Sequence, residues 1–108
     1  MFMMKDKSLL LKLTAETPLF KIIDFLVENK GIEFTKKELI EGSKISRATF
    51  FNYWSVVESY GIVKVTKKFG KTKLYTLNSN NLIVKKILDL EKALISNALE
   101  KKEIIVNN

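Results

Sequence analysis

The sequence predicts a mainly α-helical domain with one small β-hairpin, an α+β fold, followed by a long C-terminal helix. Three observations support this fold class. Helix start signals precede runs of apolar residues at helical spacing. Two stretches rich in β-branched and aromatic residues flank a glycine-containing turn. A final stretch of about 20 residues repeats its apolar positions at helical spacing. The 108 residues are enough for one domain and one appended element.

The composition excludes several kinds of function. The chain has no cysteine and no histidine, which removes disulfides, thiolate metal sites and imidazole base chemistry. There is no phosphate-binding glycine loop, so we expect no cofactor, no metal and no enzyme activity. No apolar run reaches about 18 residues and no signal-peptide cleavage site is visible, so we expect a cytoplasmic protein that is not in a membrane. The pI near 9.6 indicates an acidic partner.

Residues 1–16 are predicted to form an N-terminal arm. We expect residues 1–7 to be disordered, and residues 8–14 fit either a short strand or a packed arm. The first clear helix begins at Thr17 and Pro18, an N-cap residue followed by the residue suited to the first helical position. Gly31 is its expected stop. Its predicted core positions are Leu19, Ile22, Ile23, Leu26 and Val27.

Two more helices, separated by a tight turn, are predicted next. Thr35 and Glu38 fit a capping box, and this short second helix ends at the turn formed by residues 42–45. Ser46 then caps a third helix that runs to Tyr60. The inward-facing positions of the two helices are Leu39, Ile40, Phe50, Trp54 and Val57.

The β-hairpin carries most of the excess positive charge. Residues 62–66 and 72–77 are the predicted strands, and Lys67-Lys68-Phe69-Gly70-Lys71 is the predicted turn, with Gly70 at a positive φ. Residues 44–77 hold seven cations and one anion, a net charge of +6 against +7 for the whole chain. A helix beside a basic hairpin favours nucleic-acid binding, because the hairpin can hold the backbone while the helix reads bases.

The order of elements resembles that of the winged helix-turn-helix transcription regulators, most closely the small prokaryotic and archaeal ones of MarR/ArsR/PadR type. The matching residues are TKKELIEGSKISRATFFNYWSVVESYGIV and the KVTKKFGKTKLYTL that follows. The resemblance implies a DNA-binding domain over residues 17–78. It also implies that residues 46–60 are a recognition helix in the major groove and that residues 62–77 are a basic wing on the flanking backbone.

The resemblance and the helix geometry together indicate a set of DNA-contacting residues. Arg47 fits a contact to guanine or phosphate and Asn52 a contact to adenine, although each also fits an ordinary exposed residue. Thr49 suits a thymine methyl or a phosphate, Tyr53 suits a phosphate or simple packing, and Ser46 is chiefly a cap. The predicted DNA-binding residues are Lys44, Ser46, Arg47, Thr49, Asn52, Tyr53, Lys67, Lys68, Lys71 and Lys73.

The roles of the hairpin lysines and of Phe51 each have an alternative interpretation. The hairpin lysines fit contacts to phosphates or to the minor groove, and they also fit the usual blocking of an exposed sheet edge. Phe51 follows the core residue Phe50. We expect it in the core beneath the hairpin or in a dimer contact, and a contact to a thymine methyl is the sharper alternative.

Residues 79–108 are predicted to form a dimerisation helix and tail. Asn78 or Ser79 caps a helix from Leu82 to about Lys102, whose length of about 30 Å exceeds what so small a domain covers. Its apolar stripe fits the domain's own core or a contact between two copies, and we favour a homodimer. The predicted dimerisation residues are Ile83, Ile87, Leu90, Leu94, Ile95 and Ala98.

We expect a sequence-specific transcription regulator that binds double-stranded DNA as a homodimer and is associated with the nucleoid. Two alternatives remain open. One is an architectural or segregation module that binds DNA with little sequence preference, and the other is a winged-helix module that binds an acidic protein. An enzyme is the least favoured interpretation, and no residue pattern indicates an effector ligand.

Overall fold

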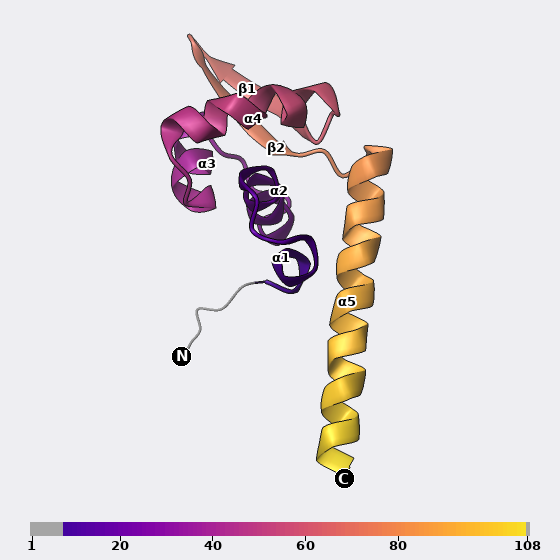
Figure 1. The fold of residues 1–108 in the computed structure, drawn as a ribbon. Coiled ribbons are helices and arrows are strands. Elements are labelled where there is room, and N and C mark those ends of the chain that lie inside the picture. Colours follow the sequence, from indigo (N-terminus) through magenta and orange to yellow (C-terminus); the bar gives the residue numbers. More distant parts are fainter. Residues whose placement is uncertain (1–7, 108) are drawn as a thin grey trace.

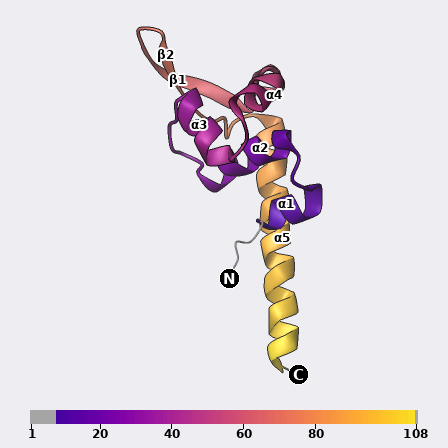
Figure 2. The ribbon, with the colours of Figure 1, turned by 60° about the vertical axis from the view of Figure 1, so that its left-hand side comes forward.

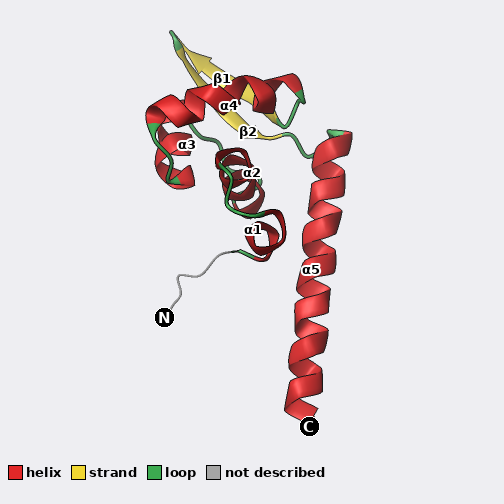
Figure 3. Ribbon diagram, viewed as in Figure 1, coloured by secondary structure: helices red, strands yellow, loops and turns green. Residues whose placement is uncertain are grey.

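The computed structural model describes residues 8–107, with side chains through residue 101, so the predicted disorder of residues 1–7 lies outside it. Its elements are α1 (Leu9–Thr14), α2 (Pro18–Glu28), α3 (Lys36–Ser43), α4 (Arg47–Ser59), β1 (Val63–Phe69), β2 (Thr72–Leu77) and α5 (Leu82–Asn107). Figure 1 shows α2, α3 and α4 gathered beside the hairpin, while α5 begins near the base of the hairpin, runs past α1 and extends beyond it. The predicted α+β fold class is confirmed, as the helices and paired strands of Figure 3 show.

The three central helices begin where the sequence predicts. Thr17 caps α2, Thr35 forms the predicted capping box at the start of α3, and Ser46 caps α4. Each cap oxygen accepts an N–H group that the first helical turn leaves without a partner, so the start of the helix is decided locally. The end of α2 is less well predicted, because the helix stops at Glu28 and the turn to positive φ comes only at Gly31.

The N-terminal stretch forms a helix, so the strand alternative for residues 8–14 is wrong. Ser8 caps α1 by accepting the N–H of Leu11 at 3.1 Å, and its own hydroxyl donates to Asp24 Oδ1 at 2.6 Å. Leu10 and Leu11 are buried, and α1 contacts both α2 and α5 (Figure 2). The six residues are too few to show a period, so only packing reveals the helix.

The hairpin is longer than predicted and its turn is shorter. Antiparallel pairing continues to Phe69 and Thr72, which leaves only Gly70 and Lys71 in the turn. Lys67 and Lys68 therefore lie in β1, not in the turn. A bulge between Val65 and Lys67 shifts the register within β1, and such bulges bend a strand and increase its twist.

The core lies where the three central helices meet the base of the hairpin. Phe50 of α4 is fully buried and stacks on Trp54, with ring centroids 5.0 Å apart. Trp54 meets Tyr75 of β2 edge to face, also at 5.0 Å. Tyr75 and Phe34 exchange two backbone hydrogen bonds of 2.8 Å, which tie β2 to the segment before α3. These contacts fix the orientation of α4 against the hairpin. The predicted core positions found buried are Ile22, Ile23, Leu26, Val27, Leu39, Phe50, Trp54 and Val57.

Helix α5 joins this core only through its first turns. Its cap is Asn81, whose Oδ1 accepts the N–H of Val84 at 3.1 Å, so the prediction of Asn78 or Ser79 is wrong. Val84 is fully buried, and Ile87 packs against the core cluster. The helix has 26 residues, which corresponds to about 39 Å of length at 1.5 Å per residue. Among the described residues, no helix has the length and apolarity that a membrane span requires.

Candidate nucleic-acid interface

A basic cleft lies between the first turn of α3, the N-terminal half of α4 and strand β2. Its volume is about 490 Å³. Five of its lining residues are cations, and none carries a carboxylate. The lining residues are Thr35, Lys36, Lys37, Arg47, Phe51, Lys71, Thr72, Lys73 and Tyr75. A concave surface with this charge attracts a polyanion.

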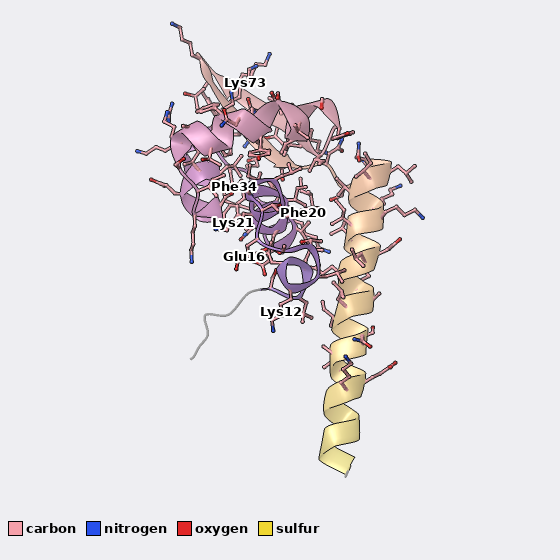
Figure 4. The ribbon with its side chains drawn as sticks, viewed as in Figure 1. Lys12, Glu16, Phe20, Lys21, Phe34 and Lys73 are labelled. Atoms are coloured by element: carbon pink, nitrogen blue, oxygen red, sulfur yellow. The ribbon has the colours of Figure 1, made fainter. Side chains whose placement is uncertain are left out.

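Local structure brings these cations together. The cap at Thr35 puts Lys36 and Lys37 in the first turn of α3, and the cap at Ser46 makes Arg47 the first residue of α4. The positive end of each helix dipole then lies at the cleft, where it adds to the attraction for anions. Strand β2 supplies the opposite wall, and Figure 4 shows Lys73 on the hairpin above the helices.

The aromatic rings of Phe51 and Tyr75 line the cleft, and two of its cations lie near aromatic rings. The guanidinium carbon of Arg47 lies 5.1 Å from the centre of the Phe51 ring. The ammonium of Lys36 lies 5.8 Å from the Phe51 ring, 6.0 Å from that of Trp54 and 5.8 Å from that of Tyr75. Cation–π attraction at such distances favours these positions for both charges. Both cations therefore lie beside aromatic rings at the cleft.

Phe51 is the residue whose environment differs most from expectation. It is 42% exposed and lines the cleft, so it does not lie in the core beneath the hairpin. Its ring meets that of Phe50 edge to face, with centroids 5.3 Å apart. The core face of α4 is already occupied by residues 50, 54 and 57, and successive residues of a helix point about 100° apart. Phe51 therefore lies beside the core face, at its border with solvent.

The other predicted residues of α4 have mixed environments. Asn52 is exposed. The hydroxyl of Ser46 donates to Thr49 Oγ1 at 2.8 Å, while Ser46 Oγ accepts the Thr49 N–H at 3.1 Å. Both residues are therefore part of the helix cap. Tyr53 is half-buried and packs against the core cluster. Of the predicted residues of α4, Arg47 and Asn52 are thus the exposed polar side chains that the helix cap does not use.

Some of the predicted hairpin lysines line the cleft, and others lie outside it. Lys71 and Lys73 line the cleft, and Lys68 pairs with Lys73 across the hairpin. Lys67 lies outside the cleft, with its Nζ 3.5 Å from a carboxylate oxygen of Glu33. A hydrogen bond from Thr66 and the charge of Lys67 hold the pKa of Glu33 below its usual value. Glu33 therefore stays ionised and partly neutralises the hairpin at that side.

Lys44 is not brought to the cleft. It has a left-handed conformation, with φ 58°, in the turn between α3 and α4. There it lines a separate cavity of about 320 Å³, together with the buried residues Asp24 and Ser43. Burial raises the pKa of Asp24, although the hydrogen bond from Ser8 works in the opposite direction. Lys44 therefore lies at a different surface from the cleft residues.

Several cleft residues were outside the predicted set, notably Lys36, Lys37, Phe51 and Tyr75. The sequence did contain a signal for the two lysines, because residues directly after an N-cap lie at the positive end of a helix, where two cations are unfavourable without a further role. Tyr75 gave no such signal, since an aromatic residue in a strand is normally a core residue.

The predicted dimerisation residues on α5 differ in how far they are exposed. Ile83, Leu90 and Ile95 are exposed, and Leu99 is exposed as well. Ile87, Leu94 and Ala98 are half-buried. The fully buried residue of this helix is Val84, which was not among the predicted positions. The helix therefore has an inner face that packs on its own domain and apolar residues at both borders of that face.

No protein-family model matches this chain, and no curated protein matches it. Among solved structures, the chain is similar to the crystal structure of Sso10a-2, a DNA-binding protein from Sulfolobus solfataricus. The TM-score is 0.51 at 15% sequence identity, over 81% of this chain and 90% of that chain. At this identity the likeness concerns the fold. The chain has a fold of the winged-helix type, in which a helical domain carries a two-stranded hairpin and a long C-terminal helix.

Proposed function

We propose that this protein binds double-stranded DNA and regulates transcription as a homodimer. The observation that carries the proposal is the cleft whose lining includes five cations and no carboxylate. A duplex presents rows of phosphates beside exposed base edges, so cations on a helix and on the adjacent hairpin can bind it together. The similarity to Sso10a-2, a DNA-binding protein, supports the proposal. Such a role agrees with a cytoplasmic, nucleoid-associated protein.

In the proposed complex, α4 enters the major groove and the hairpin lies on the flanking backbone. Arg47 offers a planar pair of donors to guanine, and its contact with Phe51 limits the orientations of the guanidinium. Asn52, about a turn and a half further along α4, offers an amide to adenine. The hairpin lysines supply affinity without reading sequence. This division of roles is that of the MarR/ArsR/PadR-type regulators that the sequence resembles.

The homodimer rests on the exposed apolar residues of α5. Ile83, Leu90, Ile95 and Leu99 lie on a helix that extends past its own domain (Figure 1). Fully burying an exposed side chain of this kind contributes about 1.5–3 kcal/mol. These side chains are 37–61% exposed, so a second copy that covered them would gain part of that amount at each. A two-fold axis would present two α4 helices to half-sites about 34–36 Å apart, one turn of DNA.

An architectural DNA-binding module is the second candidate. The observation that favours it is the distribution of charge, because α4 contributes Arg47 while residues 64–73 of the hairpin contribute five lysines. Binding dominated by phosphate contacts has little sequence preference. The two candidates differ in what α4 does, not in where DNA binds.

Selection of bound duplexes from a random pool tests these candidates together. Enrichment of a palindrome with half-sites one turn apart supports a dimeric regulator, and a footprint on it should be discrete. Binding that falls steeply with salt but enriches no sequence supports the architectural module. An absence of salt-dependent binding would overturn DNA binding, and a partner of a different class, such as an acidic protein, would then be sought.

The dimer is tested separately with Leu90→Glu. We expect a homodimer by light scattering for the parent protein and a monomer for this variant, because a carboxylate in an apolar contact is strongly unfavourable. Ser96→Glu is the matched control, since Ser96 is exposed and points elsewhere on the helix. A parent protein that is monomeric at high concentration would contradict the proposed dimer while leaving DNA binding open.

A further inference from the structure

The tip of the hairpin carries an exposed aromatic ring that neither the core nor the cleft uses. Phe69 is the last residue of β1 and is 61% exposed. The core residue Phe50, by comparison, is fully buried. A phenylalanine ring in water forgoes the free energy that burial would supply. The ring is therefore available for contact with a partner outside the described chain.

The surroundings of Phe69 indicate the chemistry of that partner. Lys67, Lys68, Lys71 and Lys73 all lie within four residues of it, and all four are exposed. Of these, Lys67 has an acidic neighbour in Glu33. An apolar ring with cations close to it along both strands matches a surface that is apolar at its centre and anionic at its borders. The stacked bases of a duplex between two phosphate backbones have this arrangement.

The shape of the tip fits a narrow groove. The turn consists of Gly70 and Lys71, and Gly70 has φ +58° with open space around it. Figure 1 shows this end of the hairpin projecting beyond the helices. Because Phe69 pairs with Thr72 across the turn, the ring is held at the end of a paired strand. The minor groove of B-form DNA, about 6 Å wide, is too narrow for a helix but can admit such a tip.

We propose that Phe69 enters the minor groove, wedges between two base pairs and bends the duplex. This inference rests on the proposed DNA binding and adds an activity to it, the deformation of DNA. Apolar wedges partly unstack a base step and kink the duplex by about 20–90° towards the major groove. Lys68 and Lys71, on either side of the ring in sequence, would bind phosphates on the two borders of the groove. Their contacts would offset the lost stacking.

The experiment measures bending directly. A duplex of about 30 base pairs carries a donor and an acceptor fluorophore at its ends, and energy transfer is recorded at saturating protein. A 2-aminopurine base in the bound region reports unstacking. We expect the parent protein to raise both signals. Phe69→Ala should bind with an unchanged salt dependence, a several-fold lower affinity and no rise in either signal.

Two further variants complete the test. Phe69→Leu keeps an apolar wedge and should retain most of the bend. Tyr60→Ala removes another exposed aromatic ring, 57% exposed at the far end of α4, and should bend DNA as the parent does. Bending by Phe69→Ala equal to that of the parent would overturn the wedge, as would a parent protein that binds without bending. A parent that does not bind DNA would instead overturn the proposed function itself.

Discussion

Helix α4 and the hairpin form opposite walls of one cleft, yet different forces hold them. Phe50, Trp54 and Val57 of α4 are buried, so its position depends on the core. Beyond Val63, the residues of β1 are exposed, and that strand is held by backbone pairing with β2. The comparison teaches that residues of the outer hairpin can change with little effect on folding. Residues of α4 affect folding or binding according to the face on which they lie.

The two walls also differ in charge. α4 carries Arg47 and Glu58, whereas residues 64–73 of the hairpin carry five lysines and no acid. Phosphate contacts depend on the number of charges and base contacts on the geometry of a few donors. We therefore expect affinity to follow the hairpin and sequence preference to follow α4. Four predictions test this comparison, from the largest expected effect to the smallest.

Phe50→Ala should destabilise the protein by about 3–5 kcal/mol, because it leaves a cavity beside Trp54 in the core. Urea unfolding measures the change, with fluorescence of the single tryptophan as the signal. Phe69→Ala, at the exposed tip, should change stability by about 0.5 kcal/mol or less. Equal losses from the two variants would contradict the idea that packing holds α4 and pairing holds the hairpin.

Arg47→Ala should cost about 1–3 kcal/mol on a selected DNA site and little on random DNA, because it would remove the proposed bidentate contact to a base. Fluorescence anisotropy on the two duplexes measures both values. Arg47→Lys is the control, since it keeps the charge but loses the planar pair of donors. If Arg47→Ala weakens binding equally on both duplexes, Arg47 contacts phosphate and does not read sequence.

Replacing Lys68 and Lys71 together by Gln should weaken binding to every duplex. We expect the slope of log K against log salt to fall by about two, one for each lost phosphate contact. Lys85 and Lys86 are the matched control pair, because they are exposed on α5 and their replacement removes the same charge. A similar change of slope in the control would mean that net charge matters and the hairpin does not.

Glu33→Gln should raise DNA affinity slightly at neutral pH, because it frees Lys67 from its ion pair. The pKa of Glu33 is lowered, so the carboxylate is ionised at neutral pH, and its favourable contacts are lost as pH falls through that pKa. The parent protein should therefore approach the affinity of the variant in acid. Glu58→Gln, an exposed acid near the end of α4, is the control. A drop in affinity for Glu33→Gln would show that Glu33 orients Lys67 for binding.

The sequence was sufficient to predict the central helices, because the residues that start these helices act locally. The N-cap residues Thr17, Thr35 and Ser46 act on N–H groups within one turn, so they can be recognised without the rest of the fold. The core face of α4 follows from a period of 3.6 residues. α1 could not be predicted in the same way, since one and a half turns show no period and the helix is stabilised by contacts with α2 and α5.

The residues of the candidate site differ in the same way: some could be predicted from local sequence features, and others depend on contacts between distant segments. Arg47 and the hairpin lysines could be selected from the sequence, because a first helical residue and a basic turn are local features. The pairing of Lys67 with Glu33, and the contact of Lys36 with three aromatic rings, join residues far apart in the chain. Distances of this kind depend on how the elements pack, which no spacing in the sequence reports.

The sequence by itself therefore determined the elements, their order and the excess of charge near the hairpin. Only the tertiary structure decided which charges meet in one cleft, that Phe51 lines it, and that the ring of Phe69 is exposed at the tip. The physical reason is that caps, turns and periodicity act within a few residues, whereas burial and charge clustering are properties of surfaces assembled from distant segments.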